Sequence, residues 1–108
     1  GENLGSRPME LILMGLGGCT AYDVVDILQK SRQPLVNLSV SINAQRAEAI
    51  PAVFEKITIH FTVVGAGVDP GRVQRAIDLT AEKYCSASIM LEKGGVEITH
   101  TFEIVAEG

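Results

Sequence analysis

The chain has 108 residues, 46% of them hydrophobic and 20% charged, which predicts one folded domain over residues 1–108 and excludes a disordered chain. Nine Lys and Arg residues against 13 Asp and Glu residues give a net charge of -4, which argues against a nucleic-acid partner. The two cysteines and two histidines are too few for a disulfide-stapled scaffold and match no zinc motif, so we expect no metal and no other cofactor.

The sequence also predicts the compartment. No apolar stretch reaches the roughly 20 residues that cross a bilayer, and no basic segment precedes a short apolar core as in a signal peptide. We therefore expect a cytoplasmic protein with no membrane partner. Because the chain begins at Gly1 without an initiator Met, we also expect it to be a shortened form of a longer product.

The first predicted element is a helix over residues 8–31, with Ser6 as its N-cap. In its first half, apolar side chains point all round the helix axis, whereas a helix on a protein surface confines them to one stripe. This half therefore has to be surrounded by protein. Since a single chain would leave it in water, we infer a two-fold homodimer with these helices at its centre.

Two runs of alternating polarity follow, and each predicts a strand with one buried face. The first covers residues 36–44, and the second covers residues 54–64, with His60 on its polar face. These two strands suit an antiparallel pair. A last strand is predicted over residues 96–105, where His100 interrupts the apolar face and is expected to be a core histidine with satisfied hydrogen bonds.

A second helix is predicted over residues 69–91, between the second and third strands. Asp69 is its expected N-cap, and Gly94 and Gly95 end it. At 100° per residue one apolar stripe runs along its whole length, which makes Tyr84 a core residue. The stripe comprises Val73, Ala76, Ile77, Thr80, Tyr84, Ala87 and Leu91. The element order, helix-strand-strand-helix-strand, predicts the α+β class.

Each predicted helix carries one cysteine. Cys19 lies in the middle of the first helix, where an apolar half meets a charged half, and Cys85 lies at the border of the apolar stripe of the second. Because Gly15, Gly17 and Gly18 disfavour helix, we expect them to permit close packing of another segment near Cys19. Free cysteine is among the most buried residue types, so composition alone favours two inert core thiols.

Two motifs, one in each helix, carry a family resemblance. They read Pro8-Met9-Glu10-Leu11, Gly17-Gly18-Cys19-Thr20-Ala21 and Asp23-Val24-Val25 in the first helix, and Ala81-Glu82-Lys83-Tyr84-Cys85-Ser86 in the second. In this order the motifs closely resemble the OsmC/Ohr family of thiol peroxidases, and within it a less characterised OsmC-like branch. The resemblance covers nearly the whole chain. It implies an OsmC-like fold in which two chains intertwine and two long central helices pack on antiparallel sheet, with N-terminal strands that are missing from this chain.

The resemblance further implies that Cys19 is the peroxidatic thiol and Cys85 the resolving thiol. The expected function is thiol-dependent reduction of organic hydroperoxides to alcohols in oxidative stress defence, through a sulfenic acid on Cys19 and then a disulfide. A dithiol reductant, lipoyl-type in parts of the family, resets the pair. The apolar neighbours Ile12 and Leu16 favour organic hydroperoxides over hydrogen peroxide.

Two alternatives from other classes stay open: a non-catalytic OsmC-like ligand-binding dimer, and a thiol-transfer or redox-sensing protein. The family's activating Arg lies on an N-terminal strand, and its Glu position is Met9 here. In a continuous helix Glu10 points about 180° away from Cys19. Asp23, one turn past Cys19, disfavours a thiolate. The candidate cations for Cys19 are Arg7, Arg32, Arg46, Arg72 and Arg75. Arg7 and Arg46 are the two that a partner chain could bring to Cys19, and the sequence does not choose among the five.

Overall fold

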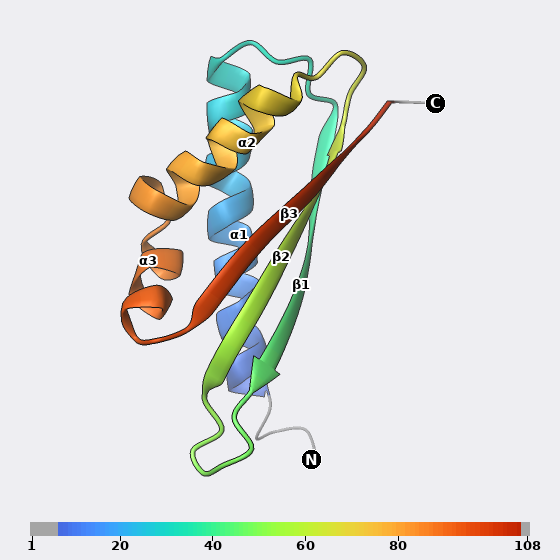
Figure 1. Cartoon of the computed structure of the whole chain (residues 1–108). Coiled ribbons are helices and arrows are strands. Elements are labelled where there is room, and N and C mark those ends of the chain that lie inside the picture. Colours follow the sequence, from blue (N-terminus) through green and yellow to red (C-terminus); the bar gives the residue numbers. More distant parts are fainter. Residues whose placement is uncertain (1–6, 107–108) are drawn as a thin grey trace.

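The computed structural model describes residues 7–106, with side chains from residue 8 onward. The elements follow in the order α1 (Arg7–Lys30), β1 (Asn37–Arg46), β2 (Phe54–Val64), α2 (Pro70–Leu79), a π-helical turn η1 (Thr80–Tyr84), α3 (Ser86–Lys93) and β3 (Glu97–Val105). Figure 1 shows the helices together on one side of a three-stranded sheet. This arrangement confirms the α+β class. Ser6, the expected N-cap of the first helix, lies outside the described residues.

The strand order in the sheet is β1-β2-β3, and its directions are mixed. β1 runs antiparallel to β2, as predicted, with Val40 opposite Phe61. β3 runs parallel to β2, so the expectation of an antiparallel sheet is wrong for this strand. The physical reason is the connection: α2 and α3 return the chain along the sheet to the start of β2, and such a crossover joins parallel strands.

The core lies between the sheet and the helices. The apolar face of β2 is almost fully buried, as its alternating pattern predicted, and it meets apolar side chains from α1 and α2. The buried apolar core positions of these three elements are Leu16, Val24 and Leu28 of α1, Phe54, Ile57, Ile59, Phe61 and Val63 of β2, and Val73, Ala76 and Ile77 of α2.

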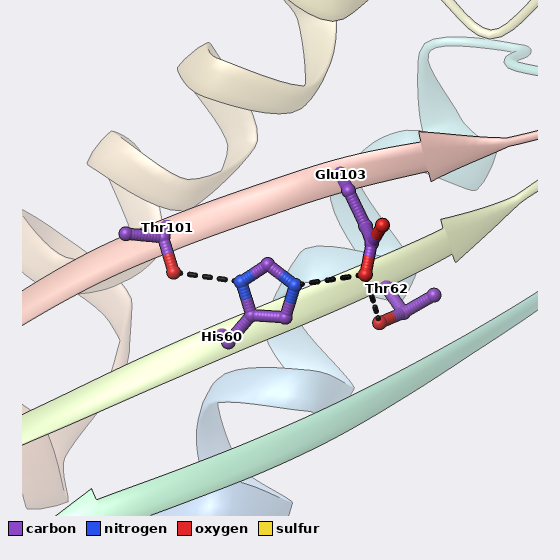
Figure 2. A network of polar contacts seen from close by, with 4 residues as sticks. All are labelled: His60, Thr62, Thr101 and Glu103. Atoms are coloured by element: carbon purple, nitrogen blue, oxygen red, sulfur yellow. Dashed lines mark hydrogen bonds and ion pairs between the residues drawn. The ribbon is translucent and has the colours of Figure 1, made fainter.

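The other face of the sheet is polar and carries the predicted polar-face position of His60. Figure 2 shows His60 of β2 between two residues of β3: its Nδ1 lies 2.7 Å from Thr101 Oγ1, and its Nε2 lies 3.1 Å from Glu103 Oε1. Thr62 donates to the same carboxylate oxygen over 3.4 Å. These contacts tie the two parallel strands together across their solvent side.

The length and apolar composition of α1 differ from what we expected of the sequence. Residues Pro8–Lys30 are long and apolar enough to cross a bilayer by length and composition, contrary to our expectation that no stretch would be. Glycine, alanine and threonine between the larger apolar side chains carry no charge and therefore do not interrupt the stretch. A core helix of a soluble protein has the same composition, and α1 packs against the sheet through Leu16, Val24 and Leu28.

The three glycines of α1 divide into two kinds. A Cβ atom on Gly17 would lie 2.8 Å from Ile42 Cδ1, so this glycine lets α1 approach β1 closely, as expected. A Cβ atom on Gly15 or Gly18 would meet nothing within 4 Å among the described residues. The expectation of close packing therefore holds within this chain for Gly17 alone.

Candidate active site

The fold brings the two cysteines together although 66 residues separate them in the sequence. Both are free thiols, and Cys85 donates a hydrogen bond from its Sγ to Cys19 Sγ over 2.8 Å. A third group completes the cluster: the ligand atoms of Cys19, Cys85 and Asp23 all lie within 4.8 Å of one another. α1 and the residue just before α3 thus supply two sulfurs and a carboxylate at one point.

α1 positions two of these three groups. Cys19 lies in the middle of an uninterrupted helix, and Asp23 follows it by one turn, so both side chains share one helix face. Cys19 is half-buried, whereas Leu16, one helical turn before it, is fully buried. The Cys19 sulfur therefore lies at the edge of the core, with solvent on one side.

Cys85 lies where the second predicted helix is interrupted. Thr80 donates its hydroxyl back to the Ala76 carbonyl over 2.8 Å, a contact that favours bending of a helix. The Cys85 N–H then bonds to the Thr80 carbonyl five residues back, over 2.8 Å, which is the π-helical pattern. Cys85 itself is extended, at φ -84° and ψ 99°, and α3 begins after it.

This break corrects two predictions. The helix expected without interruption over residues 69–91 consists of α2, η1 and α3. Tyr84, expected in the core, is 57% exposed, whereas Cys85 is fully buried. The π turn holds one residue more than an α-helical turn. The buried position that an α-helix would place at Tyr84, four residues after Thr80, therefore falls at Cys85. Cys85 thereby turns from the border of the stripe to its centre, toward Cys19.

Cys85 also acts as the N-cap of α3. Its sulfur accepts a hydrogen bond from the Ser88 N–H over 3.4 Å, in the place where a serine or aspartate oxygen usually serves. The sequence does not single out Ser88 as a partner of Cys85, because Ser88 contributes a backbone N–H that any residue except proline could supply.

The environment keeps Cys85 protonated. Burial raises the pKa of the Cys85 thiol to about 12, and the hydrogen bond that it donates to Cys19 and the negative charge of Asp23 act in the same direction. The Ser88 N–H opposes this shift in pKa. At neutral pH Cys85 is therefore a neutral hydrogen-bond donor.

The charged group beside the two sulfurs is an acid. Within residues 8–106, the groups that shift the pKa of Cys85 include Asp23 and no cation. Arg46, a candidate from the sequence, donates its Nε to the Ala52 carbonyl over 2.8 Å at the end of β1. Arg7, the other candidate from a partner chain, has a side chain outside the described part. Glu10 lines a groove between α1 and β1 and, as predicted, does not join the cysteine cluster.

Cavities of about 580, 350 and 230 Å³ lie along α1, and the smallest of these adjoins the cluster. The cavity of about 580 Å³ is a groove between α1 and β1 on the side of α1 away from Cys19. The cavity of about 230 Å³ is lined by Asp23, Asp26, Ile27, Lys30 and Tyr84. Solvent therefore reaches the carboxylate of the cluster through this smallest cavity.

Known proteins resemble this chain in sequence and in fold. The family described as OsmC-like protein matches residues 1–101. Protein YhfA of Escherichia coli strain K12 is 52% identical over 99 residues, which cover 92% of this chain and 73% of YhfA. The crystal structure of a hypothetical protein from Aquifex aeolicus VF5 has a TM-score of 0.87 at 34% identity, covering 94% of this chain and 75% of that one.

A more distant structure has the same fold. The organic hydroperoxide resistance protein OsmC from Legionella pneumophila has a TM-score of 0.71 at 14% identity, covering 89% of this chain and 68% of that one. The family match over residues 1–101 and the 52% identity to YhfA show similarity in sequence as well as in fold. The chain belongs to the OsmC-like protein family.

Proposed function

We propose that this protein reduces organic hydroperoxides to alcohols with Cys19 as the peroxidatic and Cys85 as the resolving thiol. The Cys19 thiolate attacks the terminal peroxide oxygen, the O–O bond breaks, and the alkoxide takes a proton and leaves as the alcohol. Cys19 is then a sulfenic acid. Cys85 attacks this sulfur, the S–S bond forms, and the hydroxyl leaves as water. Two thiols lose the two electrons that the peroxide gains.

One observation carries the proposal: Cys85 Sγ lies 2.8 Å from Cys19 Sγ. Disulfide formation requires the two sulfurs to meet with little movement of the backbone. Cys85 has a second advantage, because it stands at a break between helices and is not held by an α-helical hydrogen bond on its N–H. The pair is therefore arranged for a two-cysteine cycle.

Exposure and charge support the two proposed roles. Cys19 is half-buried and open to solvent on one side, whereas Cys85 is fully buried and its pKa is raised to about 12. Access and the thiolate both decide which thiol reacts first with a peroxide. Cys19 is the one that a hydroperoxide can reach, and the Cys85 S–H supplies a hydrogen-bond donor at the Cys19 sulfur.

The remaining parts of the proposal concern partners. Leu11, Met14 and Tyr22 of α1 are 63%, 69% and 74% exposed in a single chain, which favours a homodimer that covers α1. A dithiol reductant of the lipoyl type would return the disulfide to two thiols by exchange. Two free thiols in working order require a reducing compartment, which favours the cytoplasm.

The experiment mixes reduced protein with cumene hydroperoxide and follows peroxide loss, alcohol formation and protein mass together. We expect one equivalent of peroxide to be consumed per chain, with loss of two hydrogens and a peptide that links Cys19 to Cys85. Cys19→Ser abolishes consumption. Cys85→Ser permits the first step and accumulates a sulfenic acid that dimedone traps. Peroxide consumption that survives in Cys19→Ser contradicts the assignment.

A second candidate is thiol transfer or redox sensing by the same pair, because two sulfurs 2.8 Å apart suit a disulfide formed by exchange as well as one formed through a sulfenic acid. For this candidate the disulfide forms by exchange with another disulfide. A Cys19–Cys85 link that forms rapidly with oxidised lipoamide, but no faster with hydroperoxide than an unactivated thiol reacts, decides for it.

A further inference from the structure

We propose that Cys19, Cys85 and Asp23 together bind a zinc ion when both cysteines are reduced. The three residues offer two sulfur ligands and one carboxylate ligand, and these atoms lie within 4.8 Å of one another. Zinc is held in proteins by this set of donors, and soft thiolate ligands select it over magnesium or calcium. The site uses the same thiols as the proposed peroxide cycle, but binding requires no peroxide chemistry.

The geometry needs one small adjustment. Two sulfurs bound to one tetrahedral zinc at about 2.3 Å each lie roughly 3.8 Å apart. Cys19 and Cys85 are 2.8 Å apart in the hydrogen-bonded thiol pair, so the sulfurs separate by about 1 Å as the ion enters. The spacing of Cys19 and Asp23 is that of two ligands on one face of a helix, four residues apart, as in helical zinc motifs.

The negative charge of Asp23 suits a metal site better than it suits the peroxide cycle. Beside a lone thiolate its carboxylate is unfavourable, but beside a divalent cation it is attractive. The neighbouring acid one turn on, Asp26, is paired with Lys30 over 2.9 Å. Within residues 8–106 no ion pair engages Asp23. Its carboxylate is therefore available to the ion.

Zinc binding involves no oxidation or reduction, and its bonds and protons balance as follows. Zinc forms two Zn–S bonds and one Zn–O bond, the two S–H bonds break, and two protons pass to the buffer. Three protein ligands leave a fourth tetrahedral position for water, and the cavity of about 230 Å³ beside Asp23 and Tyr84 gives water and the ion a route in. The pattern is invisible in the sequence because Cys85 joins the two α1 ligands only through the fold.

The test titrates reduced protein with zinc chloride against a chromophoric chelator and records proton release with a pH indicator. We expect one ion and two protons per chain, and no binding after the Cys19–Cys85 disulfide has formed. Asp23→Asn, which keeps both thiols, weakens binding at least tenfold. Glu10→Gln is the matched control, an acid on the same helix that lies outside the cluster, and leaves the affinity within twofold of the parent.

Two outcomes overturn the proposal. One is equal zinc affinity in the parent and Asp23→Asn, which removes the carboxylate from the site. The other is equal affinity in the parent and Cys19→Ser, which places the ion elsewhere. Failure of the peroxide reaction leaves these measurements intact, because zinc binding is read without peroxide. Circular dichroism of each variant establishes that it is folded before titration.

Discussion

The two cysteines lie in different kinds of helical segment: Cys19 in a continuous helix and Cys85 at a break between two helices. Figure 1 shows α1 as one continuous helix and α2 and α3 as separate helices. α1 runs through Cys19 without interruption, whereas α2 ends six residues before Cys85 and α3 begins immediately after it. Cys19 keeps its side chain at the edge of the core because a regular helix fixes it there. Cys85 is fully buried because a π turn shifts the helix phase by one residue.

In the proposed reaction, this difference gives one rigid and one adaptable thiol. The thiol proposed to meet the substrate gains from a fixed position, since its distance to a bound peroxide must be reproducible. The thiol proposed to close the disulfide has to move toward it, and a break between two short helices allows this with fewer helix hydrogen bonds to lose. The proposed function therefore depends on the point where the regular helix pattern ends.

The largest effect is expected from removing the break. Deleting Glu82 shortens η1 by one residue and restores an α-helical phase from α2 to α3. Cys85 then turns about 100° round the helix axis, away from Cys19. We expect disulfide formation after peroxide addition to slow at least 100-fold, measured by mass after quenching. Glu82→Ala, which keeps the length of the turn, is the control.

A rate in the deletion variant equal to that of Glu82→Ala contradicts the role of the π turn. The comparison holds only between folded proteins, so far-ultraviolet circular dichroism and the unfolding midpoint accompany each rate. A folded deletion variant that reacts with peroxide but retains the sulfenic acid on Cys19 gives the sharpest support, because it separates the first step from the second.

The sequence predicted the regular parts of this molecule well. The alternating pattern of β2 gave its buried face, because a strand with one buried side has a period of two that no helix shares. Asp69 caps α2 by accepting from the Gly71 N–H, and Gly95 follows α3 with φ +99°, both as predicted. Turn and cap chemistry is local, and it can therefore be recognised from a few neighbouring residues.

The irregular parts escaped prediction for physical reasons. A π turn costs one extra residue, and a pattern of 100° per residue averages over it, so Tyr84 and Cys85 were placed one position out of phase. The direction of β3 depends on the crossover through α2 and α3 and not on its own residues. Only the family resemblance predicted that the two thiols act as a pair, since no local pattern joins residues so far apart in the sequence.

A smaller effect tests Cys85 as a helix cap. Cys85→Ser keeps an acceptor for the Ser88 N–H, whereas Cys85→Ala removes it at the same buried position. We expect Cys85→Ser to have a free energy of unfolding about 1 kcal/mol higher than Cys85→Ala, the usual value of an N-cap side chain. Urea unfolding of both variants measures it. Equal stability shows that burial alone, and not capping, holds Cys85 in place.

The smallest effect concerns His100, under the broken segment. Its Nε2 is buried and has no hydrogen-bond partner among the described residues, so the prediction that its hydrogen bonds are satisfied is wrong for this atom. Burial lowers the pKa of His100, while Glu92 and Asp78 raise it and so oppose the shift. Glu82 and Lys93 face the same cavity, and the ring stacks on Phe61 with centroids 6.3 Å apart.

A lowered pKa in the folded state sets the sign of the pH dependence. Below its ordinary pKa of about 6.5, His100 binds a proton more readily in the unfolded chain, so the free energy of unfolding falls as pH decreases from there through the folded pKa. His100→Phe, which fills the same position beside Phe61, should lose this part of the decline, and Glu92→Gln should steepen it because a group that favours the charged ring is gone. Urea unfolding across this pH range measures both. An unchanged slope in His100→Phe assigns the decline to another group and leaves the cavity under α3 without a role in acid stability.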